Sequence, residues 1–72
     1  MNMIQQDERY TLMECDSGTV IVINPTKDKP AMLQLEDNDE GITYIALTNE
    51  DIDLLIEALQ NAKNSPAGTA LH

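Results

Sequence analysis

Four short runs of apolar and β-branched residues, separated by turn residues, constrain the fold of this chain more than any other feature. The runs cover residues 10–15, 19–24, 31–36 and 42–47. The second run, TVIVIN, is rich in the β-branched side chains that favour strands. Because the connections between the runs are short, consecutive strands are expected to pair as antiparallel neighbours. The sequence therefore predicts a four-stranded antiparallel meander.

The connections carry the residues that turns require. Residues 16–18 (DSG) predict a tight turn that joins the first two strands into a hairpin, with Gly18 supplying a positive φ. Pro25 and Pro30 bracket the next connection, and neither can continue a strand because proline has no N–H group. Residues 37–41 (DNDEG) form the third turn.

After the fourth run, the spacing of apolar residues changes to that of a helix over residues 49–62. Thr48 is the expected N-cap, Asp51 completes a weaker form of the capping box, and Lys63 suits the C-terminus. The apolar positions fall at i, i+3, i+4 and i+7: Ile52, Leu55, Ile56 and Leu59. The predicted fold is α+β, a four-stranded antiparallel meander followed by one C-terminal amphipathic helix packed on one sheet face.

The chain is expected to form a single domain over residues 1–63. Residues 1–9 are polar and predicted to be frayed or a lead-in to the first strand, and residues 64–72 are predicted to be a disordered tail. With 72 residues, such a domain buries only about 60% of its unfolded surface, so its stability is marginal. Good packing or self-association has to make up the deficit.

Apolar side chains occur on both faces of the predicted sheet, whereas one helix covers only one face. An uncovered apolar face marks an interface. We therefore predict a homodimer, formed by sheet-on-sheet packing or by edge strands that pair across a two-fold axis. The alternative is that the N-terminal segment, with Met3 and Ile4, folds over the second face. The residues predicted on the self-association face are Met13, Ile42 and Tyr44.

The net charge of −9, from 13 acidic and 4 basic residues, restricts the partners of this chain. Phosphate backbones and anionic membranes would repel such a surface, so direct binding of nucleic acid or membrane is not expected. The partners that fit are basic proteins. The alternative interpretation is that the charge serves solubility alone.

A meander brings the turns at residues 16–18 and 37–41 to the same end of the sheet, and this end is strongly acidic. The opposite end mixes acids with Lys27 and Lys29. An end of one charge can steer a basic partner into contact, although acidic turns are also common simply as solvated loops. The acids predicted to bind a partner are Glu14, Asp16, Glu36, Asp37, Asp39 and Glu40.

No residue pattern predicts a catalytic or metal site. Residues 37–41 do not fit a calcium loop, because Gly41 stands where the fifth ligand should be. Cys15 and His72 are too few for a zinc site, and His72 ends a predicted tail, which argues against a nucleophile and base. There is no glycine-rich phosphate loop. We therefore expect no cofactor, no metal and no enzyme activity.

The lone Cys15 excludes an internal disulfide and fits a reducing compartment. Residues 1–8 lack the apolar stretch of a signal peptide, so a cytoplasmic location is expected.

The predicted function is that of a non-catalytic, homodimeric interaction module, whose acidic end docks on a basic protein and regulates or inhibits it. In a sharper form, its carboxylates mimic the phosphates of a nucleic acid, as in small inhibitors from phages and mobile elements. One alternative is a subunit that binds a small ligand or metal between protomers. Another is an assembly component of a larger complex.

Overall fold

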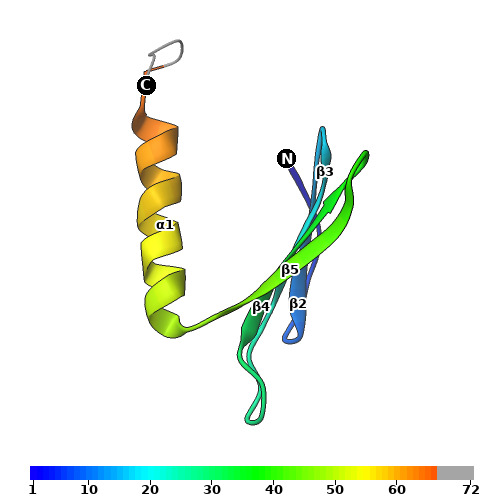
Figure 1. Ribbon diagram of the computed structural model, residues 1–72, viewed down its shortest axis with the longest axis vertical. Coiled ribbons are helices and arrows are strands. Elements are labelled where there is room, and N and C mark those ends of the chain that lie inside the picture. Colours follow the sequence, from blue (N-terminus) through cyan, green and yellow to red (C-terminus); the bar gives the residue numbers. More distant parts are fainter. Residues whose placement is uncertain (67–72) are drawn as a thin grey trace.

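An antiparallel sheet followed by one helix makes up the computed structural model, which describes residues 1–66 (Figure 1). The strand order follows the chain order, and each strand pairs antiparallel with the next. The predicted α+β meander with a C-terminal helix is confirmed, with a fifth strand added at the N-terminus. The elements are β1 (Asn2–Gln6), β2 (Tyr10–Cys15), β3 (Gly18–Ile23), β4 (Ala31–Asp37), β5 (Gly41–Leu47) and α1 (Asn49–Asn64).

The additional strand is β1, which the polar segment 1–9 forms in place of a frayed lead-in. It pairs with β2, and a bulge between Met3 and Gln5 interrupts the register. The turn into β2 is organised by Asp7, whose Oδ1 accepts hydrogen bonds from the backbone N–H groups of Arg9 (2.8 Å) and Tyr10 (3.1 Å). Strand pairing uses backbone groups, so a segment with few apolar side chains can still extend the sheet.

The glycines of the two acidic turns have different roles. The prediction that Gly18 supplies a positive φ is wrong, because within residues 1–66 only Gly41 has one (φ 94°). Gly18 is buried at the start of β3, where a Cβ atom would collide with the backbone carbonyl oxygen of Glu36 in β4. It is therefore glycine because β3 and β4 approach closely at this point.

The helix begins with the capping box that the sequence predicts. The Thr48 hydroxyl accepts a hydrogen bond from the Asp51 N–H group (3.0 Å), and the Asp51 carboxylate accepts one from the Thr48 N–H group (2.9 Å). The helix extends two residues beyond the predicted end, to Asn64, and Ser65 caps it. The Ser65 hydroxyl donates a hydrogen bond to the carbonyl oxygen of Asn61 (2.9 Å).

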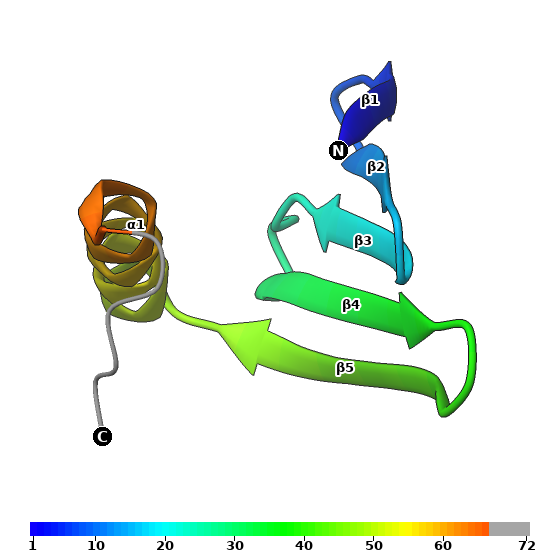
Figure 2. The same cartoon turned by 90° about the horizontal axis from the view of Figure 1, so that it is seen from above.

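The helix stands beside the sheet and contacts it only weakly, through β5 (Figure 2). Ile52 and Leu55 are half-buried, whereas Ile56 and Leu59 of the same predicted face are exposed. No residue of α1 is buried. The expected packing of the helix on the sheet is therefore present only in a loose form.

The single chain has almost no core. Within residues 1–66, Ala31 is the one buried hydrophobic side chain. The chain exposes 6130 Å² of surface, compared with about 4,450 Å² for an ordinary folded monomer of 8.0 kDa. Its radius of gyration is 13.8 Å, against about 11 Å for a compact domain of this length. Within the described residues, no helix combines the length and apolar character needed to cross a membrane.

A candidate interaction surface

The two faces of the sheet are defined by the strand register, because residues directly opposite one another share a face. One face looks toward α1, and we call it the helix-side face; the other is the open face. The helix-side face carries Met13, Val20, Val22, Leu33, Leu35 and Ile45. The open face carries Tyr10, Leu12, Ile21, Ile23, Ile42 and Tyr44. Both faces are thus apolar, as the uninterrupted apolar runs indicate.

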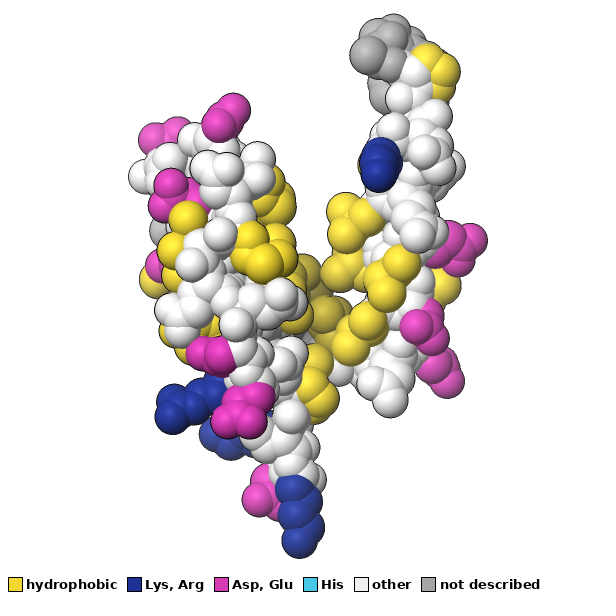
Figure 3. Space-filling model, turned by 180° about the vertical axis from the view of Figure 1, so that it is seen from behind, with side chains coloured by type: hydrophobic (Ala, Val, Ile, Leu, Met, Phe, Trp, Pro, Cys, Tyr) yellow, Lys and Arg dark blue, Asp and Glu magenta, His cyan; other side chains and the backbone are white. Residues whose placement is uncertain are grey.

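An apolar gap separates α1 from the helix-side face. Its closed end, near the connection between β5 and α1, is a hollow of about 430 Å³. Figure 3 shows apolar side chains of the sheet and of the helix facing each other across this gap, with acidic side chains on the outer side of the helix. The residues that line the hollow are Leu33, Ile45, Ala46, Leu47, Asp51, Leu54 and Leu55.

The structure separates the residues predicted for self-association. Ile42 and Tyr44 lie together on the open face, and they are 60% and 65% exposed. Met13 lies opposite Val20 on the helix-side face. The tight turn after Cys15 fixes which residues of β2 and β3 lie opposite one another. It thereby places Met13 opposite Val20, on the same face of the sheet.

The N-terminal segment leaves the open face uncovered. Met3 and Ile4 belong to β1, which extends the sheet beyond β2, and they are 59% and 55% exposed. The alternative in which this segment folds over the second face is therefore wrong.

The two acidic turns meet at one end of the sheet, as the meander predicts. The N–H group of Asn38 donates a hydrogen bond to the carbonyl oxygen of Ser17 (3.0 Å), which joins the β4–β5 turn to the β2–β3 turn. Glu14 and Glu36 both lie opposite Thr19, so they share the open face beside these turns. This acidic end therefore contains all six predicted acids: Glu14, Asp16, Glu36, Asp37, Asp39 and Glu40.

The carboxylates of the acidic end differ in whether they form hydrogen bonds. Asp37 shapes its turn, because its Oδ1 accepts hydrogen bonds from the N–H groups of Asp39 (2.7 Å) and Glu40 (3.2 Å). Among the hydrogen bonds of residues 1–66, none uses the side chains of Asp16, Asp39 or Glu40. These three carboxylates are exposed, and no hydrogen bond within residues 1–66 fixes their orientation.

The opposite end of the sheet holds the basic side chains of Arg9, Lys27 and Lys29. Figure 3 shows only acidic charged groups at one end of the sheet, and Lys and Arg side chains together with acidic ones near the other. The acids of this second end are Asp7, Glu8 and Asp28. The fourth basic residue, Lys63, lies in the last turn of α1. One end of the sheet is therefore uniformly acidic, whereas the other carries both charges.

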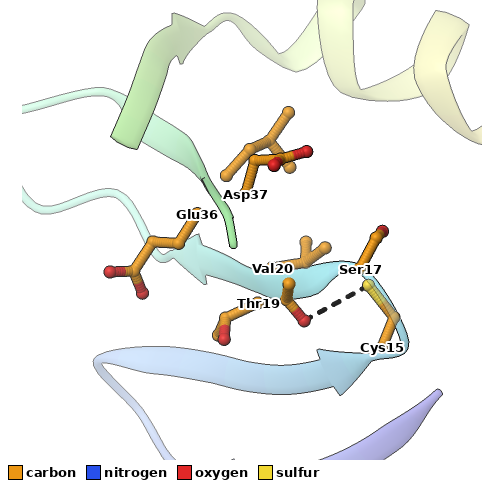
Figure 4. Close-up of a pocket in the computed structure, with 8 residues that line it drawn as sticks. Cys15, Ser17, Thr19, Val20, Glu36 and Asp37 are labelled. Carbon is orange, nitrogen blue, oxygen red and sulfur yellow. Dashed lines mark hydrogen bonds between the residues drawn. The ribbon is translucent and has the colours of Figure 1, made fainter. Parts of the chain in front are cut away.

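A second hollow, of about 180 Å³, lies between the acidic turns (Figure 4). The Cys15 thiol lines it and donates a hydrogen bond to the carbonyl oxygen of Gly18 (3.3 Å). Pockets that enclose small organic ligands are larger, at about 300–1,000 Å³. Within residues 1–66, no three His, Cys, Asp or Glu side chains are placed to hold a metal ion. His72, considered as a base for Cys15, lies outside the described residues.

Comparisons of the chain with protein-family models, with curated proteins and with solved structures find no match.

Proposed function

We propose that this chain is a non-catalytic, homodimeric interaction module that docks its acidic end on a basic protein surface and thereby regulates or inhibits that protein. The uneven distribution of charge along the sheet carries this proposal. Six of the 13 acidic residues gather at one end, while three of the four basic residues lie at the other. Solubility alone requires a net charge and no such separation.

The acidic end has the physical properties of a docking site for a basic surface. Asp16, Asp39 and Glu40 belong to two turns that a backbone hydrogen bond holds together, so the spacing of these three residues is partly fixed before binding. A surface of one charge raises the rate of encounter with an opposite charge and disfavours wrong partners. In the sharper form of the proposal, these carboxylates occupy the positions of phosphates in the cleft of a nucleic-acid-binding protein.

A matched pair of charge-reversal variants tests the proposal. One carries Asp16→Lys, Asp39→Lys and Glu40→Lys at the acidic end, and the other carries Glu8→Lys, Asp53→Lys and Glu57→Lys elsewhere. Each changes the net charge from −9 to −3, since three reversals add six charges. Binding is measured by fluorescence anisotropy against a panel of purified basic nucleic-acid-binding proteins, with duplex DNA as competitor.

The acidic-end variant is expected to lose at least about tenfold in affinity, because it removes the local complementarity. The control variant should keep its affinity within roughly threefold at matched ionic strength. Equal losses in both variants would show that only total charge matters, and would reject the docking site.

A second candidate function, an assembly component, is favoured by the open face with its exposed Ile42 and Tyr44. In this case the apolar face joins a larger complex. Tyr44→Asp would then abolish recovery of this chain in that complex, whereas the acidic-end variant would be recovered normally.

A further inference from the structure

We infer that a second copy of this chain covers the apolar surface that α1 and the helix-side face expose. Two chains then pack about a two-fold axis, and the apolar side of each helix contacts the other chain. This inference rests on the homodimer of the proposed function and names the surface that forms it.

The exposed area of the chain matches what a stable dimer buries. Each chain exposes roughly 1,700 Å² more than a folded monomer of its mass, so two chains have about 3,400 Å² to bury. Obligate homodimers bury about 2,000–5,000 Å² in total. A dimer through this apolar surface would remove the excess without any foreign partner.

The helix has enough apolar surface for two neighbours. At about 100° per residue, the apolar positions from Leu54 and Ala58 round to Ile52 and Ile56 span roughly 200° of its circumference, about twice the stripe of a helix with one neighbour. Leu54 lies at the gap, where it lines the hollow together with residues of the sheet, and Ala58 lies next to Leu54 on the helix surface. Leu59 and Ile56 are 61% and 49% exposed, and a partner chain would cover them.

The helix and the strands are matched in length. The 16 residues of α1 extend about 24 Å, and the seven residues of β4 or β5 extend about 24 Å. The apolar side of the helix and the helix-side face are therefore similar in length, so a second chain can contact both.

The connection to β5 keeps each helix away from its own sheet. It consists of Thr48 alone, between the end of β5 and the start of α1. The two capping-box hydrogen bonds fix this residue in an extended conformation (φ −80°, ψ 170°). Bringing α1 closer to its own sheet would require changed torsions at this connection, so the apolar side of the helix stays open to a second chain.

Charge selects the helix-side face over the open face. A two-fold contact brings identical surfaces together, so like charges within it repel. Between β2 and β5 the body of the helix-side face is uncharged, and Asp37 stands only at its end. The open face carries Glu14 and Glu36 beside its apolar residues. Two chains, each with a net charge of −9, therefore repel each other less when they associate through the helix-side face than through the open face.

Light scattering of wild-type protein and two variants tests the inference. Leu54→Glu places a charge in the gap, and Tyr44→Glu places one on the open face; both residues are more than 60% exposed in the single chain. The wild type is expected to have twice the chain mass of 8.0 kDa, at low and at high salt. Leu54→Glu should weaken dimerisation at least about a hundredfold, while Tyr44→Glu remains dimeric.

A monomeric wild type, or a dimer that survives Leu54→Glu, would overturn the inference. A second measurement needs no variant: isotope-filtered methyl NOEs in an equal mixture of labelled and unlabelled chains. Contacts between Leu54 or Leu59 of one chain and Leu33 or Ile45 of another are expected. If these contacts occur only within one chain, α1 folds onto its own sheet and the inference fails.

The acidic-end variant separates this inference from the proposed function. It should remain a dimer, because its substitutions lie outside the gap. Loss of binding to basic proteins with an intact dimer tests the docking site alone, and loss of the dimer in Leu54→Glu tests the dimer surface alone.

Discussion

The sheet and the helix of this protein are both regular, but they are held in different ways. Each strand pairs with its neighbours through backbone hydrogen bonds between separate segments of the chain. The helix is held by its own hydrogen bonds and its caps at Thr48 and Ser65, and it touches the rest of the described chain only at β5. The sheet is thus a tertiary structure, whereas the helix is a local one.

This difference shows that strands and helices can form although their side chains build almost no hydrophobic core. Strand pairing and capping satisfy the backbone, while the apolar side chains of both elements stay exposed. A 16-residue helix is marginal in water by itself, since most helix stability comes from packing an apolar face. The helix is therefore the part of the molecule that would gain most stability from packing against a further surface.

The largest effect is expected where the sheet is most tightly packed. Gly18→Ala would drive a Cβ atom into the Glu36 carbonyl group and should cost about 3 kcal/mol, because backbone cannot move aside easily. Gly41→Ala, with nothing within 4 Å of the new Cβ, should cost only about 1 kcal/mol for its positive φ. Denaturant unfolding measures both. Equal midpoints would show that β3 and β4 have room to separate.

An intermediate effect is expected at the start of the helix. Thr48→Ala removes the hydroxyl that accepts from the Asp51 N–H group and should destabilise the helix by about 1 kcal/mol, whereas Thr48→Ser should retain the cap. Amide hydrogen exchange should show faster exchange in α1 and unchanged exchange in β2–β4. If the sheet loses protection equally, the two regions are coupled more tightly than their few contacts indicate.

The smallest effect is expected when the pH is lowered and the β1–β2 hairpin is weakened. Backbone hydrogen bonds from Arg9, and further bonds from Gln5 and Tyr10, lower the pKa of the Asp7 carboxyl below its usual range. A lowered folded-state pKa means that this stabilisation is present above the unfolded pKa, near 4, and is lost as the pH falls through the folded pKa.

The amides of β1 should therefore lose protection below about pH 4, before those of β3 and β4. Asp7→Asn removes the titrating group, and should weaken β1 at neutral pH and flatten this dependence. A wild-type β1 with constant protection down to pH 2 would contradict the role of Asp7.

Residue types and spacing predicted the elements that are built from apolar patterns. The strand at residues 10–15 has its predicted bounds, β3 is shifted by one residue at both ends, and β4 and β5 each differ by one residue at one end. The strand β1 was not predictable from apolar spacing, because it is polar and paired through its backbone. Its one local signal is Asp7, whose side chain closes the turn before Tyr10.

The candidate site was only partly predictable. The meander alone places Asp16 and Asp39 at one end, because alternate turns of a meander share an end. The sequence does not show that α1 stands off the sheet, since amphipathic spacing specifies an apolar face and not what covers it. The separation of Met13 from Tyr44 followed from register, which depends on the length of the β2–β3 turn.

The bulge in β1 has a consequence for aggregation. An edge strand with regular unpaired backbone groups is a template onto which further chains can add, and a bulge disrupts that template. The other edge, β5, is regular over its seven residues. Growth of a continuous sheet from chain to chain needs two competent edges, so this protein can join edge to edge once, through β5, and cannot propagate a fibril by that route.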